Sequence, residues 1–234
     1  MTMVQTRLFR VFRFARDGRD SRFDEFHVPL DESTTVLEGL RWIRLHRDPS
    51  LSIRHSCLHA SCGTCGVRAN GREALACVTL IESDTVTVEP MANIPVLTDL
   101  VVDMAPFFDR FQPDHPLVRS TEVTPASSGS LGEPFERFED CIECGLCLSA
   151  CPIAATDDRY VGPAALAWAQ RVLEDPRGAS ADDVLEWADA EHGAWQCHAA
   201  FECTEACPSE VFPAERIMKL RRALTIRRLP SETT

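Results

Sequence analysis

The sequence predicts an α+β protein with a sheet in its N-terminal part and helices in its C-terminal part. Residues 7–14 mix arginine with apolar side chains in near alternation, as a half-buried strand does. Apolar residues then recur at helical spacing over residues 36–43. Beyond residue 160, helix-start signals open three further runs. A chain of 234 residues is long enough for two modest domains, each with its own core.

The N-terminal elements follow one another with clear boundaries. Gly18 supplies a turn between the first strand and a second one over 23–29, which predicts a hairpin. Residues 31–35 offer helix caps, and the helical run that follows stops at Asp48-Pro49. Asn70-Gly71 is a two-residue hairpin signal, and residues 86–89 can close the sheet. Strand, strand and helix in this order open a β-grasp domain.

The second half of the chain is predicted to be helical. We expect a short helix after Pro95, and residues 121–132 have the composition of a linker. Gly162-Pro163 opens a helix to residue 174, Ser180 caps a second one, and Pro213 opens a third to about residue 224. The predicted division is a β-grasp domain over 1–105, a linker over 106–132 and a helical domain over 133–234. Three tryptophans are expected to be core or interface aromatics: Trp168, Trp187 and Trp195.

Composition and charge exclude several function classes. A net charge of -12 argues against binding to nucleic acid, which requires a basic face. No apolar run approaches the ~20 residues of a membrane-spanning helix, and the first residues lack the apolar core of a secretory signal, so we expect the cytoplasm. The eleven cysteines are odd in number and include C-x2-C spacings, which favours thiolate-metal ligation over disulfides.

The spacing of the cysteines in the second half predicts two iron-sulfur clusters. One run has the bacterial C-x2-C-x2-C-x3-C-P spacing, in which the fourth cysteine binds a different cluster: Cys141, Cys144, Cys147 and Cys151, followed by Pro152. A second run, Cys197-x5-Cys203-x3-Cys207-Pro208, has Ala200 where the second cysteine would be. Crossing the runs gives a four-thiolate set for a 4Fe-4S cluster: Cys141, Cys144, Cys147 and Cys207. The remaining three suit a 3Fe-4S cluster: Cys151, Cys197 and Cys203.

The N-terminal half carries a third cysteine pattern. The plant-type 2Fe-2S spacing, C-x4-C-x2-C with a distant fourth cysteine, is formed by Cys57, Cys62, Cys65 and Cys77. Gly63 and Gly66 permit backbone paths that turn N–H groups toward an anionic cluster. The alternative is a zinc site, but zinc sites usually use two separated cysteine pairs. His55 and His59 flank the loop and are expected beside the cluster or at the surface, since four thiolates already satisfy it.

Together, the three spacings in this order resemble the iron-sulfur subunit of succinate dehydrogenase and quinol:fumarate reductase. The resemblance covers nearly the whole chain. Its supporting stretches are Arg54-His-Ser-Cys57, Asn70-Gly71 before Cys77, Val88-Glu-Pro-Met91, Phe138-Glu-Asp-Cys141-Ile-Glu-Cys144, Val161-Gly-Pro-Ala164 and Trp195-Gln-Cys197-His198.

The resemblance implies an electron relay without catalytic residues of its own. Electrons would pass from FAD on a flavoprotein subunit through the 2Fe-2S, 4Fe-4S and 3Fe-4S clusters to a quinone. The complex would sit at the cytoplasmic face of the cell membrane, held by transmembrane anchor subunits in which haem b is an open question. By position, the quinone pocket would be lined by Pro152, Ile153, His198 and Ala200.

Several alternatives stay open at this point. His198 would either hold or protonate quinone or hydrogen-bond a cluster sulfide. The arginine-rich stretches 219–222 and 227–228 would contact lipid headgroups or simply end a solvated helix. The segment Ile153-Ala-Ala-Thr156 lacks the tryptophan usual in succinate:ubiquinone enzymes, which leaves menaquinone and the fumarate-reducing direction open. A soluble multi-cluster ferredoxin and a heterodisulfide-reductase type subunit are the other classes, and both fit the cysteine pattern less well.

Overall fold

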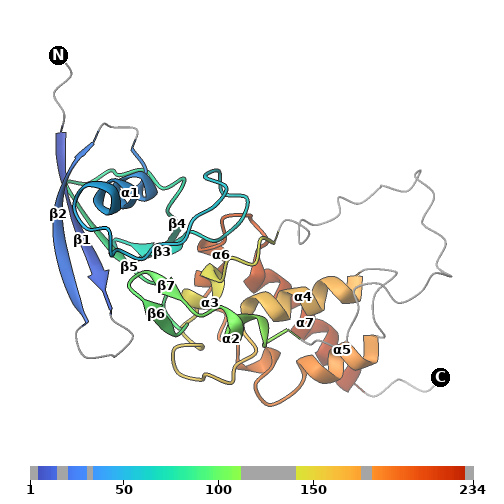
Figure 1. Cartoon of the computed structure of the whole chain (residues 1–234). Coiled ribbons are helices and arrows are strands. Elements are labelled where there is room, and N and C mark those ends of the chain that lie inside the picture. The colour runs from blue at the N-terminus through green and yellow to red at the C-terminus, as the bar shows by residue number, and fades with distance from the viewer. Residues whose placement is uncertain (1–4, 15–20, 31–33, 112–140, 175–180, 230–234) are drawn as a thin grey trace, which may run out of the picture. The chain divides into compact units, whose positions relative to one another are not determined.

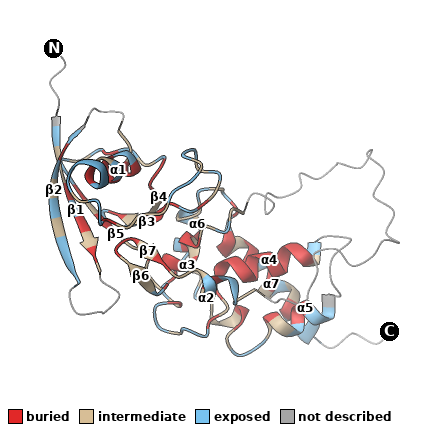
Figure 2. Ribbon diagram, viewed as in Figure 1, coloured by how far each residue is buried: buried red, intermediate tan, exposed pale blue. Residues whose placement is uncertain are grey.

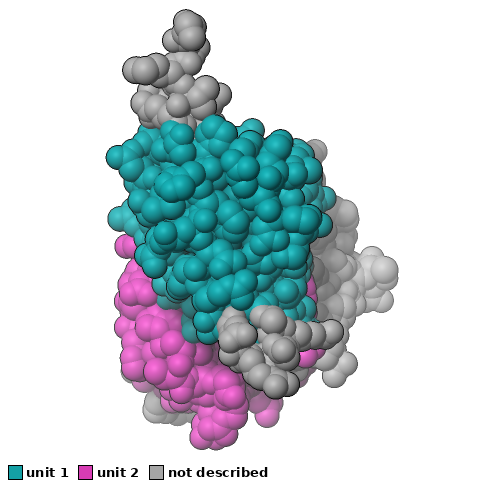
Figure 3. All heavy atoms as spheres, turned by 60° about the vertical axis from the view of Figure 1, so that its left-hand side comes forward, with its two compact units in different colours: residues 1–106, 142–150 teal, residues 107–141, 151–234 magenta. Residues whose placement is uncertain are grey.

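A computed structural model describes residues 5–14, 21–30, 34–111, 141–174 and 181–229 (Figure 1). The chain forms two compact units, one of residues 1–106 and 142–150 and the other of residues 107–141 and 151–234 (Figure 3). We call them unit 1 and unit 2. Most of the predicted linker and the predicted cap Ser180 lie outside the described residues.

Unit 1 is built on a five-stranded mixed sheet with the strand order β2-β1-β5-β3-β4. The strands are β1 (Gln5–Arg13), β2 (Arg22–Leu30), β3 (Gly66–Ala69), β4 (Arg72–Leu75) and β5 (Thr85–Glu89). β1 pairs antiparallel with β2 along its whole length and parallel with β5, and β3 pairs antiparallel with β4 across the Asn70-Gly71 turn. Both predicted hairpins and the closing strand are confirmed.

Helix α1 (Val36–His46) packs on this sheet through the apolar stripe that its sequence predicts. Thr35 caps it in a reciprocal capping box with Glu38, which satisfies two otherwise unpaired backbone N–H groups. Gly39 sits directly on the ring of Phe9, because a Cβ there would come within 2.2 Å of the ring. The buried side of α1 is red in Figure 2.

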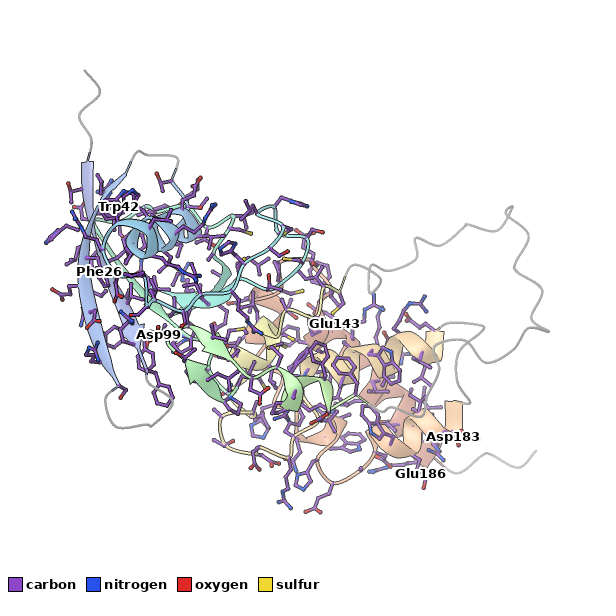
Figure 4. The ribbon with its side chains drawn as sticks, viewed as in Figure 1. Phe26, Trp42, Asp99, Glu143, Asp183 and Glu186 are labelled. Atoms are coloured by element: carbon purple, nitrogen blue, oxygen red, sulfur yellow. The ribbon has the colours of Figure 1, made fainter. Side chains whose placement is uncertain are left out.

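The chain after Pro95 differs from the predicted helix. It forms a short hairpin of β6 (Val96–Thr98) and β7 (Val101–Val102), and only α2 (Ala105–Phe108) is helical. The reason lies at Asp99, labelled in Figure 4, which turns the chain with a left-handed φ of 45°. Its buried carboxylate accepts hydrogen bonds from Arg13 Nε at 3.1 Å, Phe14 N at 3.0 Å and Ser52 N at 2.8 Å. These long-range bonds outweigh the local helical pattern.

The segment 142–150, although late in the sequence, belongs to unit 1. It contains the one-turn helix α3 (Leu146–Ser149), and its end is held by hydrogen bonds from Ala92 N to Ser149 Oγ at 2.8 Å and from Asn93 Nδ2 to the carbonyls of Leu148 and Ser149 at 2.9 Å. The compact units therefore differ at this segment from the predicted division into residues 1–105 and 133–234, which stays a prediction.

Unit 2 is helical where it is described. Its elements are α4 (Pro163–Glu174), α5 (Ala181–Ala188), the 3-10 turn η2 (Ala194–Gln196), α6 (Glu202–Glu205) and α7 (Pro213–Arg228). Helix α4 is buried along nearly its whole length and packs against α7, where Arg216 reaches Gln170 at 2.9 Å and Glu174 at 3.1 Å. All three predicted helices are confirmed, and α7 runs four residues beyond the predicted end.

The tryptophans of unit 2 have different environments. Trp168 is buried and meets Trp187 edge to face, with 6.4 Å between ring centroids. Trp195 is instead half-buried and makes cation–π contacts with Arg221 and Arg228, whose guanidinium groups each lie 4.9 Å from its ring centroid. None of the helices in the described parts of the chain is long and apolar enough to span a membrane.

Candidate iron-sulfur cluster sites

The loop that carries Cys57, Cys62 and Cys65 turns its backbone N–H groups toward sulfur. Left-handed residues bend it repeatedly, with φ of 65° at Leu58, 60° at Ala60 and 70° at Gly63. The N–H groups of His59 and Ser61 reach Cys57 Sγ at 3.4 and 3.3 Å, and that of Ala60 reaches Cys77 Sγ at 3.3 Å. A loop that points several N–H groups at thiolates suits an anionic cluster.

The four thiols of this loop differ in their electrostatics. Hydrogen bonding, first from the His59 N–H, lowers the pKa of Cys57 to about 7, and the hydroxyl of Thr64, 3.1 Å away, lowers the pKa of Cys62. Burial raises the pKa of Cys65 to about 12. The Cys57 thiol interacts with the Cys62 thiol, and the Cys65 thiol interacts with the Cys77 thiol. All four predicted 2Fe-2S ligands therefore lie together in unit 1.

The histidines near this loop are not among the converging groups. His59 is exposed and bonds through its ring Nδ1 to the carbonyl of Cys57 at 2.5 Å, and His55 is exposed as well. Among the described residues, no three His, Cys, Asp or Glu side chains are grouped to hold a single metal ion. None of the eleven cysteines forms a disulfide bond.

The two later cysteine runs share one backbone conformation. In the first, Glu143, labelled in Figure 4, and Gly145 have φ of 52° and 81°, and α3 follows. In the second, Ala199 and Phe201 have φ of 55° and 64°, and α6 follows. The left-handed residues and the short helix fall at the same distances from Cys141 and from Cys197. Ala200 therefore occupies the backbone position that Cys144 occupies in the first run.

In unit 2, the thiols of one predicted set line a single cavity. Its walls include Cys151, Cys197 and Cys203. The N–H of Ala199 reaches Cys197 Sγ at 3.4 Å, while burial raises the pKa of Cys151 and brings that of Cys203 to about 12. The neighbouring thiols raise each of these two pKa values further, in agreement with the position of all three cysteines on one cavity.

The residues predicted to bind quinone line the same cavity: Pro152, Ile153, His198 and Ala200. Ile153 is half-buried and the other three residues are exposed, so these four residues form the wall of the cavity that faces solvent. The sequence reasoning missed Tyr160, which is buried against the three thiols, and Phe201, which is 38% exposed at the rim. A signal for the former existed, because Tyr160 is the only tyrosine of the chain and directly precedes the Val161-Gly-Pro163 stretch.

The predicted 4Fe-4S ligands are divided between the units. Cys144 and Cys147 belong to unit 1, and Cys141 and Cys207 belong to unit 2. Within unit 2, the N–H of Val211 donates to Cys207 Sγ at 3.4 Å, the same kind of N–H to sulfur contact as in the other two loops.

Comparison with known proteins assigns the chain to a family. Residues 8–109 match the 2Fe-2S iron-sulfur cluster binding domain, and residues 137–211 match the 4Fe-4S dicluster domain. The fumarate reductase iron-sulfur subunit of Mycobacterium tuberculosis is 38% identical over 208 residues, which cover 85% of this chain and 84% of that protein. This chain belongs to the iron-sulfur subunits of fumarate reductase and succinate dehydrogenase.

Both branches of this family are represented among its relatives. The fumarate reductase iron-sulfur subunit of Escherichia coli O157:H7 is 34% identical, covering 83% of this chain and 82% of that protein. The succinate dehydrogenase iron-sulfur subunit of Coxiella burnetii is 31% identical, covering 84% and 86%. The fold agrees with a chain of the Mycobacterium smegmatis Sdh1 complex in the apo form, at a TM-score of 0.84 and 22% identity, covering 98% of this chain and 100% of that chain.

Proposed function

We propose that this chain is the electron-transfer subunit of a membrane-bound succinate:quinone oxidoreductase of the respiratory chain and the tricarboxylic acid cycle. It relays electrons from FAD on a flavoprotein subunit through 2Fe-2S, 4Fe-4S and 3Fe-4S clusters to a quinone. The dicarboxylate site belongs to the partner, and this chain contributes thiolates, backbone N–H groups and the wall of the quinone end.

The cavity in unit 2 is the observation that carries the proposal. The cavity is lined by three thiols and by the predicted quinone residues. One of these, Ala200, occupies the backbone position that Cys144, a predicted ligand, has in the first run. Three thiolates suit a 3Fe-4S cluster, and the exposed side of the cavity is where a quinone reaches it. His198 on that side is placed to donate a hydrogen bond to a quinone oxygen or to a cluster sulfide.

The proposal also covers the domain type of each unit, the subunits around this chain and the direction of the reaction. The helix-bearing sheet of unit 1 corresponds to a β-grasp domain of the plant-type ferredoxin kind, and the helices around the later runs to a bacterial-ferredoxin-like domain. Transmembrane anchor subunits hold the complex at the cytoplasmic face of the membrane. Succinate oxidation is the principal direction, and quinol:fumarate reduction is the alternative, which the names of the relatives from Mycobacterium tuberculosis and Escherichia coli favour.

Purification from native membranes in detergent tests the proposal. The complex should contain a flavoprotein and a membrane anchor, carry about nine iron atoms per copy of this chain, and transfer electrons between succinate and quinone. Rates of succinate oxidation and fumarate reduction, each with ubiquinone and menaquinone, decide the direction and the quinone. A lone brown protein would instead identify a soluble carrier, and stoichiometric zinc with little iron would overturn the cluster assignment.

A further inference from the structure

Gly63 lies at a point where two ligand-bearing segments of unit 1 touch. It stands between Cys62 and Cys65 in the first cluster loop. A Cβ added to it would lie 2.8 Å from the Cβ of Cys144, 2.9 Å from the carbonyl oxygen of Ile142 and 3.0 Å from the Cα of Cys144. None of these atoms is the end of a flexible side chain, so any side chain at residue 63 would push the two segments apart.

Backbone conformation alone does not require a glycine here. The φ of Gly63 is 70°, but Leu58 and Ala60 carry side chains in the same loop at 65° and 60°. Gly63 has a second constraint besides its φ, which is the close approach of the Cys144 segment. The missing side chain is therefore explained by contact between the segments and not only by the turn.

The Cys144 segment is fixed in this position from its other end. Asn93 donates from Nδ2 to two carbonyls of the segment, and the buried Ser149 hydroxyl accepts from Ala92 N and bonds to Glu73 Oε1 at 3.1 Å on β4. The first cluster loop and the segment with Cys144 and Cys147 are thus parts of one compact unit.

We propose that Gly63 is a positioning residue for electron transfer from the first cluster to the second, a role that rests on the proposed function. Its absent side chain lets the first cluster loop meet the backbone of Cys144 in direct contact. Since electron transfer slows steeply as the gap between two sites widens, this contact keeps the step fast. One electron leaves the first cluster and reaches the second, and no bond forms or breaks.

Gly63→Ala and Gly71→Ala in the purified complex form a matched test. Gly71 has the same left-handed backbone, φ 79°, but no atom lies within 4 Å of a Cβ added there, so its variant carries the backbone strain without the contact. We expect Gly63→Ala to weaken the magnetic interaction between the first two clusters and to increase hydrogen exchange in residues 142–150. Single-turnover transfer between them should slow several-fold while both midpoint potentials stay unchanged. Gly71→Ala should match the wild type in every readout.

A wild-type transfer rate and magnetic interaction in an iron-replete Gly63→Ala complex would overturn the proposal. If that variant fails to load its first cluster, Asn93→Gly replaces it, because glycine accepts the φ of 60° at residue 93 and removes both bonds to the segment. If Asn93→Gly then raised hydrogen exchange in residues 142–150 but kept the wild-type rate of transfer between the clusters, the role of the contact would be refuted. The exchange and magnetic readouts need neither succinate nor quinone, so failure of the proposed function would be seen separately, in the wild-type assays.

Discussion

Ala200 shows how much a single residue decides at the third site. Its backbone is flanked by left-handed residues as Cys144 is in the first run, and it lines the cavity of Cys151, Cys197 and Cys203. The local fold is therefore the same in both runs, and only the side chain differs. In the proposed function, this difference gives the third cluster three thiolate ligands in place of four.

Ala200→Cys should convert the third cluster from 3Fe-4S toward 4Fe-4S, because it restores the full spacing on a backbone already shaped for it. Iron should rise by about one atom per chain, and the paramagnetic signal of the oxidised 3Fe-4S cluster should disappear. The change in cluster type and charge alters its potential, so quinone reduction should slow, while succinate oxidation by a dye that accepts electrons earlier persists.

Ala199→Cys is the control for this conversion, since it adds a thiol to the same cavity one residue out of register. It should leave the 3Fe-4S signal in place. An unchanged 3Fe-4S signal in iron-replete Ala200→Cys would show that residue 200 does not face the vacant corner of the cluster.

Individual residues show which parts of the site could be predicted from the sequence and which could not. Ala200 was identified from spacing alone, because the cysteine runs over residues 141–151 and 197–207 share one spacing. The contact of Gly63 with Cys144 joins positions far apart in the chain, and no local pattern records which distant segment a loop will meet. Tyr160 was missed although it is the only tyrosine of the chain, since its place beside three thiols depends on the packing of α4 and α7 around the cavity.

At the scale of elements, strands and long helices follow their local patterns, and the exception is the hairpin of β6 and β7. The apolar residues after Pro95 favour a helix locally. Asp99 instead lies buried beside Arg13 of β1, and their side chains are 6% and 7% exposed. An ion pair between residues so far apart in sequence cannot be read from periodicity, so the sequence predicted a short helix here but not the hairpin that precedes it.

Asp99→Ala should lower the free energy of unfolding of unit 1 by about 3 kcal/mol, because it leaves a buried guanidinium short of one partner. The loss of stability should lie at the low end of the range usual for a broken buried ion pair, because Asp24 and Asp48 still pair with Arg13. Urea unfolding followed by tryptophan fluorescence and by loss of the 2Fe-2S absorbance measures it.

Arg10→Ala, on the same strand as Arg13, is the comparison for this variant. Arg10 pairs with Glu25 at 3.3 Å on the surface, and both side chains are largely exposed. Removing such a pair should cost less than about 1 kcal/mol. Equal losses in the two variants would mean that the buried position of Asp99 contributes nothing beyond an ordinary surface charge.

For the whole molecule, the described units and the predicted domains divide the chain differently. Sequence composition placed the boundary in the linker, whereas the segment 142–150 is held to unit 1 by Asn93 and Ser149. Two of the eleven cysteines, Cys144 and Cys147, therefore fold with the N-terminal sheet although their sequence motif belongs to the later runs. A linear relay accounts for this arrangement, since it keeps part of the second ligand set beside the first.

The order of the relay can be tested by removing its first member. Cys65 is buried, its pKa is raised by burial to about 12, and it interacts with Cys77. In the proposed relay it is a ligand of the first cluster. Cys65→Ser should perturb or abolish the 2Fe-2S signal and leave the seven thiols of the later runs untouched. Spectra after dithionite reduction should still show the other two clusters, because an external reductant bypasses the first.

Transfer from succinate to quinone in the same variant should fall to a small fraction of the wild-type rate, because a linear relay has no second path around its first cluster. Succinate oxidation by an acceptor that takes electrons directly from flavin should continue, which separates a broken relay from a damaged flavoprotein. Full quinone reduction in a complex without the 2Fe-2S signal would show that electrons enter this chain elsewhere, and the placement of Cys57, Cys62, Cys65 and Cys77 at the start of the relay would then be wrong.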